Sequence, residues 1–518
     1  MPSVRGLIGY NRSGSTSNLL IGAFGNDLIN ISNGLGFGFG INNINDVSLE
    51  PFLDRIFFQN NSDTPITFNG TVWSREYVGR TPISKYQQRF SSRLFLGNCG
   101  FIAPQAPLDT TSTAITFPSR VFYSDVFIGN TLSWGIDWGR NGATTAGSTL
   151  FRVTTTGGGL VQDFVANNIK IGDPLFITNG DTSLTSDKPY TVTKILSSYS
   201  LQVDRNFPVT TTGQHFWVGR NWFDVEADDN DQITGFGSNS GRLLIFKLLS
   251  LHYFGSIEQG RRSVKGAKGT SSQRSILNDD LGNSYYFHAA NMKLAGIYKF
   301  NSVSSAKISR AIDPFIRGMS TDNFNKVVGW REGNELRWYL GDLTNTNFDI
   351  SMTNAVATLN LDTDSLSVDP IADIITVSTT FRTGQTENSY CGTNDSQVLK
   401  MDDGYTFNGA GIVSTLETKV YYPAGSEIIC NFPWIQIVGR NVRGTRLKYK
   451  LWDNPIDVDS SWWPLGDLIG DKTEFPIPPD HNTGAGIQFK FDEIGTQEND
   501  AYIEKISIFY KPDRMRLL

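Results

Sequence analysis

Histidines that could bind a metal or transfer a proton are scarce, because the 518-residue chain has only four: His215, His252, His288 and His481. No two of them are close enough in sequence to share a turn or a hairpin, so a metal site would need ligands from distant segments. His252 and His288 each lie within an apolar run. We therefore expect hydrogen-bonded structural histidines and no metal site.

Acidic clusters have a simpler explanation than metal binding. The cluster Asp228–Asp231 could suggest calcium, but Ile233 and Thr234 break the EF-hand spacing and no Glu closes the loop. Short polar side chains of this kind hydrogen-bond to their own backbone, so a turn is favoured.

Paired carboxylates are the residues that glycoside hydrolysis needs, provided that they face each other across a groove. Asp279 with Asp280, and Glu332 with Glu335, are candidates, but both pairs lie in predicted turns and the chain has 51 acidic residues. The sequence contains no GxSxG motif, and no His and Asp are placed to activate a particular Ser or Cys. We therefore expect a protein that is not an enzyme and that uses no cofactor.

The three cysteines, Cys99, Cys391 and Cys430, are too few and too widely spaced for a zinc site or a disulfide framework. Free buried thiols in a protein made in a reducing compartment are the expected state.

One basic run stands out, because no acidic residue interrupts it between positions 259 and 277. It is interleaved with Gly and Ser and has no aromatic residue on which a base could stack. A solvated loop, a loop that pairs with acidic groups of an adjacent subunit, and a phosphate contact all remain open. The residues are Arg261, Arg262, Lys265, Lys268 and Arg274.

Composition limits what elements could position these groups. The chain has 51 Gly, 12% aromatic and only 19% charged residues, which is typical of many short strands joined by tight turns. Its net charge of −6 does not favour binding to a polyanion such as DNA. No secretory signal and no apolar run long enough for a membrane helix is visible, so we expect no membrane-spanning segment.

A β-meander is the unit that recurs along the chain. Predicted strands at 233–236, 242–247 and 251–254 are joined by polar turns. Arg93, Arg120 and Arg242 each follow a small residue and precede an apolar run, which indicates degenerate internal repeats of the kind found in propeller blades. Roughly 330 residues, at about 40–50 per four-stranded blade, allow six or seven blades.

Changes in pattern along the chain predict an all-β protein: a β-propeller with an inserted small β-barrel or sandwich and a C-terminal β-sandwich. Residues 1–145 form an N-terminal arm and the first blades, 146–222 the insert, 223–405 the remaining blades, and 406–518 the sandwich. The Gly/Asn/Ser-rich first 45 residues suggest an arm that is ordered only against a neighbour.

Several segments resemble the β-propeller tail proteins of short-tailed bacteriophages, which form hub, nozzle or ring layers. The similarity is strongest over residues 228–318 and is moderate at 410–450. Its motifs are structural and not catalytic. The segments are Asp231–Phe236, Gly241–Lys247, Ser250–Phe254, Gly269–Ser275, Ser284–His288, Gly296–Phe300, Lys307–Ser309, Ile312–Ile316 and Glu417–Lys419.

This resemblance implies a structural virion component that assembles in the host cytoplasm as a cyclic ring, with six copies favoured and twelve as the alternative. The portal or adaptor and other tail proteins would be its neighbours, tail fibres would attach to it, and DNA would contact it only as the passing genome. An acidic surface would repel the phosphates and let the genome slide.

Two other functions fit parts of the sequence. The first is a carbohydrate-binding or carbohydrate-cleaving propeller, with Trp462–Trp463 or the pair Trp134 and Trp138 as sugar platforms, although burial between blades explains such residues more simply. The second is a tail fibre or receptor-binding protein, which usually shows trimeric repeats or a helical stalk.

Overall fold

The computed structural model divides the chain into two compact units, residues 1–401 and residues 402–518. It describes all residues except 1, 12–17, 39, 43–44, 76–81, 102–114, 126–133, 138–140, 155–162, 178–189, 215, 220, 227–228, 257–259, 349, 384–385, 402–405, 408–409, 412–414, 441, 443, 453–460, 494–501 and 516–518.

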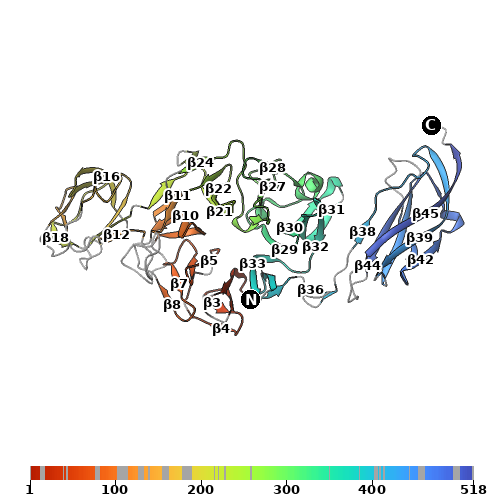
Figure 1. Ribbon diagram of the computed structural model, residues 1–518, viewed down its shortest axis with the longest axis horizontal. Helices are drawn as coiled ribbons and strands as arrows, with labels where there is room; N and C mark the ends of the chain where they lie inside the picture. Colours follow the sequence, from red (N-terminus) through yellow and green to blue (C-terminus); the bar gives the residue numbers. More distant parts are fainter. Residues whose placement is uncertain are drawn as a thin grey trace. The chain divides into compact units, whose positions relative to one another are not determined.

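The first unit contains seven small antiparallel sheets in its described part, which are the blades of a propeller (Figure 1). The predicted fold class is therefore confirmed, with seven blades where six or seven were expected.

Six blades have four strands and the last has three in the described residues. In chain order the blades are β1 (Val4–Asn11), β2 (Asn18–Phe24), β3 (Asp27–Asn30), β4 (Leu35–Gly36); β5 (Ser48–Phe52), β6 (Arg55–Gln59), β7 (Ile66–Phe68), β8 (Trp73–Arg75); β9 (Ile83–Phe90), β10 (Arg93–Phe101), β11 (Ile115–Tyr123), β20 (Trp222–Asp224); β21 (Ile233–Asn239), β22 (Arg242–Lys247), β23 (Leu251–Phe254), β24 (Arg261–Ser263); β25 (Leu277–Asn278), β26 (Ser284–His288), β27 (Gly296–Phe300), β28 (Ser305–Lys307); β29 (Val328–Glu332), β30 (Glu335–Asn345), β31 (Ile350–Asn360), β32 (Ser365–Pro370); and β33 (Ile375–Thr383), β34 (Thr386–Thr393), β35 (Val398–Lys400).

The ring closes through the first strand of each blade, because β1, β5, β9, β21, β25, β29 and β33 contact one another in that order and β33 contacts β1. At the closure Thr376 Oγ1 donates to Val4 O at 2.6 Å. Val4 and Leu7 pack against Val377 and Phe381. Figure 1 shows the N-terminus beside β33. Strands β1–β4 thus form a blade of this ring, and the expectation of an arm that awaits a neighbour is wrong, because these strands find partners within the chain.

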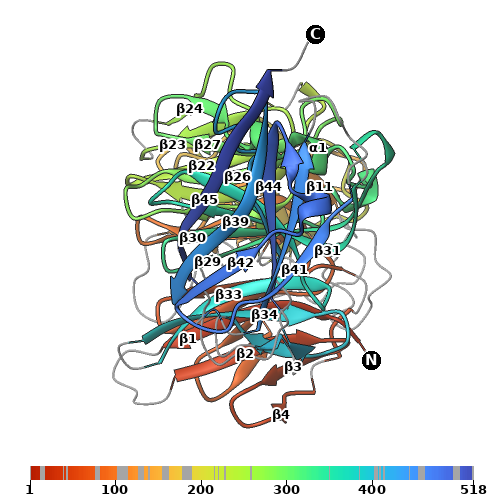
Figure 2. The ribbon, with the colours of Figure 1, turned by 90° about the vertical axis from the view of Figure 1, so that its right-hand side faces the viewer.

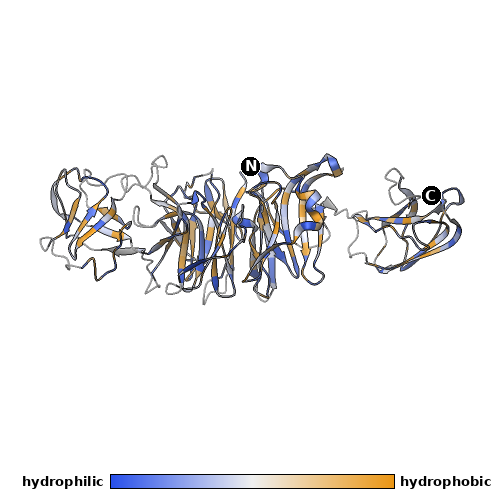
Figure 3. Cartoon of the chain, turned by 90° about the horizontal axis from the view of Figure 1, so that it is seen from above, coloured by the Kyte–Doolittle hydropathy of each residue, from blue (hydrophilic) through white to orange (hydrophobic). Residues whose placement is uncertain are grey.

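Central strands of the blades, such as β22 and β26, are buried on both faces, which explains their continuous apolar runs. In β22, Leu243 and Ile245 pack with Phe95 on one side, whereas Leu244 and Phe246 pack with a different cluster on the other side. Figure 3 shows hydrophobic stretches along the strands throughout the blades. Burying both faces links each blade to two neighbours.

The insert is an eight-stranded sheet around its own apolar core in the described residues. The chain leaves the third blade after β11 and returns at β20, where Phe122 pairs with Trp222. The sheet begins at Gly135, earlier than the predicted start at 146, and Trp222 belongs to the blade. Its strands are β12 (Gly135–Asp137), β13 (Gly142–Thr144), β14 (Leu150–Val153), β15 (Pro174–Ile177), β16 (Tyr190–Ser197), β17 (Ser200–Val203), β18 (Thr211–Gln214) and β19 (Phe216–Gly219).

The second unit is a sandwich of two antiparallel sheets around a core that includes Phe432, Ile435, Leu447 and Phe489. One sheet contains β38 (Thr415–Glu417), β44 (Gly486–Glu493), β40 (Thr445–Trp452) and β41 (Trp463–Asp467). The other contains β42 (Lys472–Pro476), β39 (Ile428–Arg440), β43 (Thr483–Gly484) and the long β45 (Tyr502–Met515), which lies along β39 (Figure 2). A short hairpin of β36 (Thr406–Phe407) and β37 (Ala410–Gly411) precedes them.

Helices are few in the described residues, and α1 (Asp313–Ile316) is a single turn. None of the described helices is both long and apolar enough to cross a membrane.

Candidate functional site

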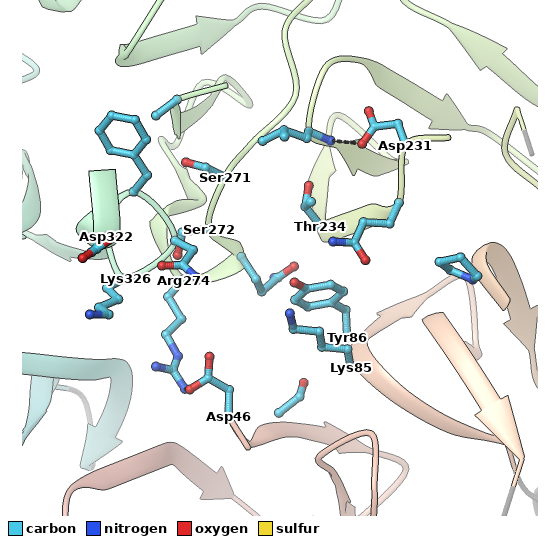
Figure 4. A pocket seen from close by; sticks show the side chains of 18 of the residues that line it. Asp46, Lys85, Tyr86, Asp231, Thr234, Ser271, Ser272, Arg274, Asp322 and Lys326 are labelled. Atoms are coloured by element: carbon cyan, nitrogen blue, oxygen red, sulfur yellow. Dashed lines mark hydrogen bonds and ion pairs between the residues drawn. The ribbon is translucent and has the colours of Figure 1, made fainter. Parts of the chain in front are cut away.

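The entry segments of successive blades surround a cavity of about 880 Å³ at one mouth of the propeller channel (Figure 4). Ser48 on β5, Lys85 on β9 and Thr234 on β21 bring the innermost strands of three adjacent blades to its wall. The loops that enter the fifth and sixth blades complete it with Arg274 and Lys326. A concave polar site of this size is large enough for a small ligand.

Arg274 lies at the centre of this mouth, in the 3₁₀ turn η2 (Gln273–Ser275). Its Nη1 donates to Thr376 O at 2.8 Å and its Nη2 donates to Arg5 O at 2.7 Å. The same Nη2 pairs with Asp46 Oδ1 at 3.1 Å. One guanidinium therefore joins the fifth blade to the two blades at the ring closure.

A second cavity of about 380 Å³ adjoins the first, and Asp46, Arg274 and Lys326 line both. The Arg274–Asp46 ion pair thus lies between two compartments of one mouth. Arg5 holds the segment that carries Asp46, because its Nη1 donates to Asn42 O at 2.7 Å and to Asn45 O at 2.5 Å.

Neutral hydrogen-bonding groups complete the lining of the mouth. Burial, with a contribution from Asp46, raises the pKa of Tyr86 well above its ordinary value, so its phenol stays protonated. Asp231 is already satisfied, since its carboxylate accepts from Leu248 N at 3.1 Å and from Leu249 N at 2.8 Å. The charged groups left for a ligand are those of Asp46, Lys85, Asp322 and Lys326, beside the neutral side chains.

The predicted basic loop does not form one surface. Arg261 and Arg262 lie on β24, the outer strand of the fourth blade, and Lys265 is exposed in the turn after it. Lys268 is half-buried, whereas Arg274 turns into the mouth. The five cations are separated because the chain passes from the outer edge of one blade to the inner end of the next between them.

The histidines hold structural positions in the described residues, and His215 lies outside those residues. Burial lowers the pKa of His288 to about 4, and its Nδ1 lies 3.2 Å from Gly269 O. His481 stacks on Trp463 with ring centroids 3.8 Å apart. Groups of three or more His, Cys, Asp or Glu side chains that could hold a metal are absent from the residues with described positions.

The surroundings of His252 resemble a hydrolase triad in composition but not in geometry. Its Nε2 lies 3.0 Å from Ser250 Oγ and 3.7 Å from Glu226 Oε2, while its Nδ1 faces Arg261. A triad needs the acid and the serine on opposite ring nitrogens. Here both are on the same nitrogen, and burial lowers the pKa of His252.

The other sequence candidates are also accounted for by internal pairing. Asp280 pairs with Arg331, and Glu332 and Glu335 both pair with Arg337. The three cysteines are free and buried, as expected.

The predicted tryptophan platforms do not form one site. Trp134 is only 3% exposed, and Trp138 lies outside the described residues. Trp463 is 40% exposed in the second unit.

Sequence reasoning missed Asp46, Lys85 and Lys326, since each comes from a different blade and none lies in a local motif. Sequence analysis named Arg274 as a candidate, but as a member of the basic run that begins at Arg261. The usable signal would have been the position of each residue at the entry to a blade, which requires blade boundaries first.

Glu50, on β5, gives a prediction about pH. Burial raises the pKa of its carboxyl from 4.5 to about 7, although the carboxylate accepts from Arg89 N at 3.0 Å. As pH rises from about 4.5 to 7 the unfolded chain loses this proton first, so the free energy of unfolding falls, by up to about 3 kcal/mol. Glu50→Gln is expected to remove this loss.

Urea unfolding of the wild type and of Glu50→Gln at pH 5 and pH 8 tests this expectation. The variant should gain stability relative to the wild type only at pH 8. Asp173, whose pKa burial raises to about 6, is present in both proteins and cancels in the comparison. An equal difference at both pH values would contradict the prediction.

Comparison with known proteins finds no matching family model and no matching curated protein. Three similar solved structures have low scores. BamB from Moraxella catarrhalis has 10% identity and a TM-score of 0.29 over 76% of this chain and 98% of its own. The exo-beta-1,3-galactanase of Phanerochaete chrysosporium has 9% identity and a TM-score of 0.22 over 90% and 97%. Phage phi92 endosialidase has 10% identity and a TM-score of 0.22 over 91% and 72%.

The expectation that this chain is not an enzyme needs correction in view of the mouth itself. The expectation depended on the absence of known local motifs. The mouth shows why that criterion is insufficient: it gathers Asp46, Asp231 and Asp322 from separate blades, which no local motif could reveal.

Proposed function

We propose that this chain is a structural component of a bacteriophage tail, in a ring layer such as a hub or nozzle. The observation that carries the proposal is the role of the motif residues that resemble such proteins. Thr270 Oγ1 donates to Phe287 O at 2.8 Å, and Ser272 Oγ donates to Val327 O at 2.7 Å. Ser275 O accepts from Trp338 Nε1 at 2.9 Å.

Thr270 N also donates to Lys247 O of the fourth blade at 3.1 Å. The Gly269–Ser275 loop therefore joins the fourth, fifth and sixth blades, and the resemblance lies in the residues that build the scaffold. In this proposal several copies surround the DNA passage below the portal or adaptor and attach tail fibres. The net charge of −6 keeps the passing genome from adhering.

Mass photometry of the purified chain, alone and with portal and adaptor proteins, tests the ring. The expected result is a closed species of six copies, or of twelve. A labelled copy should then appear in the tail in low-resolution images of the particle. A stable monomer under every one of these conditions would contradict the proposal.

A second candidate function is saccharide binding or cleavage at the propeller mouth, and one specific observation favours it. The 880 Å³ cavity is lined mainly by hydroxyl, amide and charged side chains, with the phenol of Tyr86 among them. Such groups are suited to the hydroxyls of a sugar. Binding on a glycan array, or release of reducing sugar from host envelope material, would support this candidate. Both results are compatible with a place in a phage tail, and the lack of both would contradict this candidate.

A further inference from the structure

The mouth holds a cation that is fixed in place before any ligand arrives. Two backbone carbonyls, Thr376 O and Arg5 O, accept from the guanidinium of Arg274, whose side chain is only 20% exposed. A planar guanidinium held in this way loses little freedom on binding a carboxylate.

The carboxylate now on Arg274 is weakly held by comparison. Asp46 is 64% exposed and pairs with Arg274 at 3.1 Å. Exposed ion pairs contribute little to stability, so a ligand carboxylate can replace Asp46 at little cost. Figure 4 shows Asp46 and Lys326 on either side of the Arg274 side chain.

Lys326 supplies a second cation at the same place, since it is exposed and lines both cavities. The carboxylate of Asp231 accepts from two backbone amides, which fixes its position but leaves its charge, and the exposed Asp322 lines the same cavity as Lys326. Lys85 lines the same cavity, and the rest of the mouth offers the Tyr86 hydroxyl and neutral polar side chains, in a volume much larger than a simple anion needs.

We propose that the propeller mouth binds a saccharide that carries a carboxylate, of the uronic acid class. Its carboxylate takes the place of Asp46 on Arg274 and contacts Lys326, and its hydroxyls bind Tyr86 and the neutral side chains. This inference rests on the second candidate function and adds the class of saccharide.

Isothermal titration calorimetry of the full chain with a uronic acid disaccharide, its neutral hexose counterpart and inorganic phosphate tests the proposal. The acidic disaccharide should bind at least tenfold more tightly than the neutral one. Asp46→Asn removes the internal competitor and should tighten binding of the acidic disaccharide by about fivefold. Lys326→Gln should weaken only the acidic disaccharide, by about tenfold.

Lys505→Gln, an exposed change on β45 in the second unit, is the matched control and should alter nothing. Equal affinity for both disaccharides, or a lower affinity of Asp46→Asn for the acidic disaccharide, would overturn the choice of an acidic saccharide. The second candidate function, saccharide binding, would not be affected. Phosphate that binds as tightly as the disaccharide would overturn the ligand class. No binding of either disaccharide would overturn both the inference and the second candidate function.

Discussion

Gly269→Ala is expected to destabilise the propeller by about 3 kcal/mol or more, or to prevent folding. A Cβ at Gly269 would lie 1.6 Å from Lys247 O and 2.7 Å from Ser250 O. Both are backbone atoms that cannot rotate away. Lys247 O also accepts from Thr270 N at 3.1 Å, so moving it would break the junction between the fourth and fifth blades.

Urea unfolding and soluble yield measure this effect. Gly470→Ala is the control, because an added Cβ there meets no atom within 4 Å. The control should change stability by no more than about 0.5 kcal/mol. Wild-type stability in Gly269→Ala would show that the blade junction is not packed as described.

Lys247→Met is expected to cost about 3–5 kcal/mol, since it removes one partner of a buried charged network. The Lys247 side chain is completely buried, donates to Val225 O and Glu226 O at 2.9 Å each, and pairs with Asp229. Methionine has a similar shape, so the loss is one of hydrogen bonds and charge and not of volume. Both carbonyls would be left without this donor.

Unfolding curves of Lys247→Met are compared with those of Lys505→Met, which replaces an exposed lysine on β45. The control should show little change in the free energy of unfolding. Adding Asp229→Asn to Lys247→Met should recover part of the loss, because no unpaired carboxylate then remains. Destabilisation below about 1 kcal/mol would mean that water satisfies the pocket.

Much of the propeller could be predicted because blade strands are buried on both faces. The run Leu243–Phe246 is apolar at every position, and the Asn–Ser–Gly turn at 239–241 marks the hairpin before it. The start of the insert could not be predicted in the same way. Gly135–Asp137 and Gly142–Thr144 are short strands with few apolar residues, so their pairing is set by the sheet and not by their own pattern.

The mouth was not predictable for a related reason. Asp46 and Arg274 meet only because the ring brings the segment before the second blade close to the entry of the fifth. Arg274 is more than 100 residues away in sequence from each of its partners Arg5, Asp46 and Thr376. Sequence analysis therefore grouped it with the basic residues next to it. Residues that act together across a ring leave no signal in their spacing.

The contact between β1 and β33 also dictates an order of events during synthesis. The strand that begins at Val4 leaves the ribosome first, but its partner at Ile375–Thr383 emerges only after the other blades and the insert have been made. Until then the apolar face of the first blade at Val4 and Leu7 stays uncovered in the nascent chain. Chaperone capture of stalled chains should therefore end only when translation has passed Thr383.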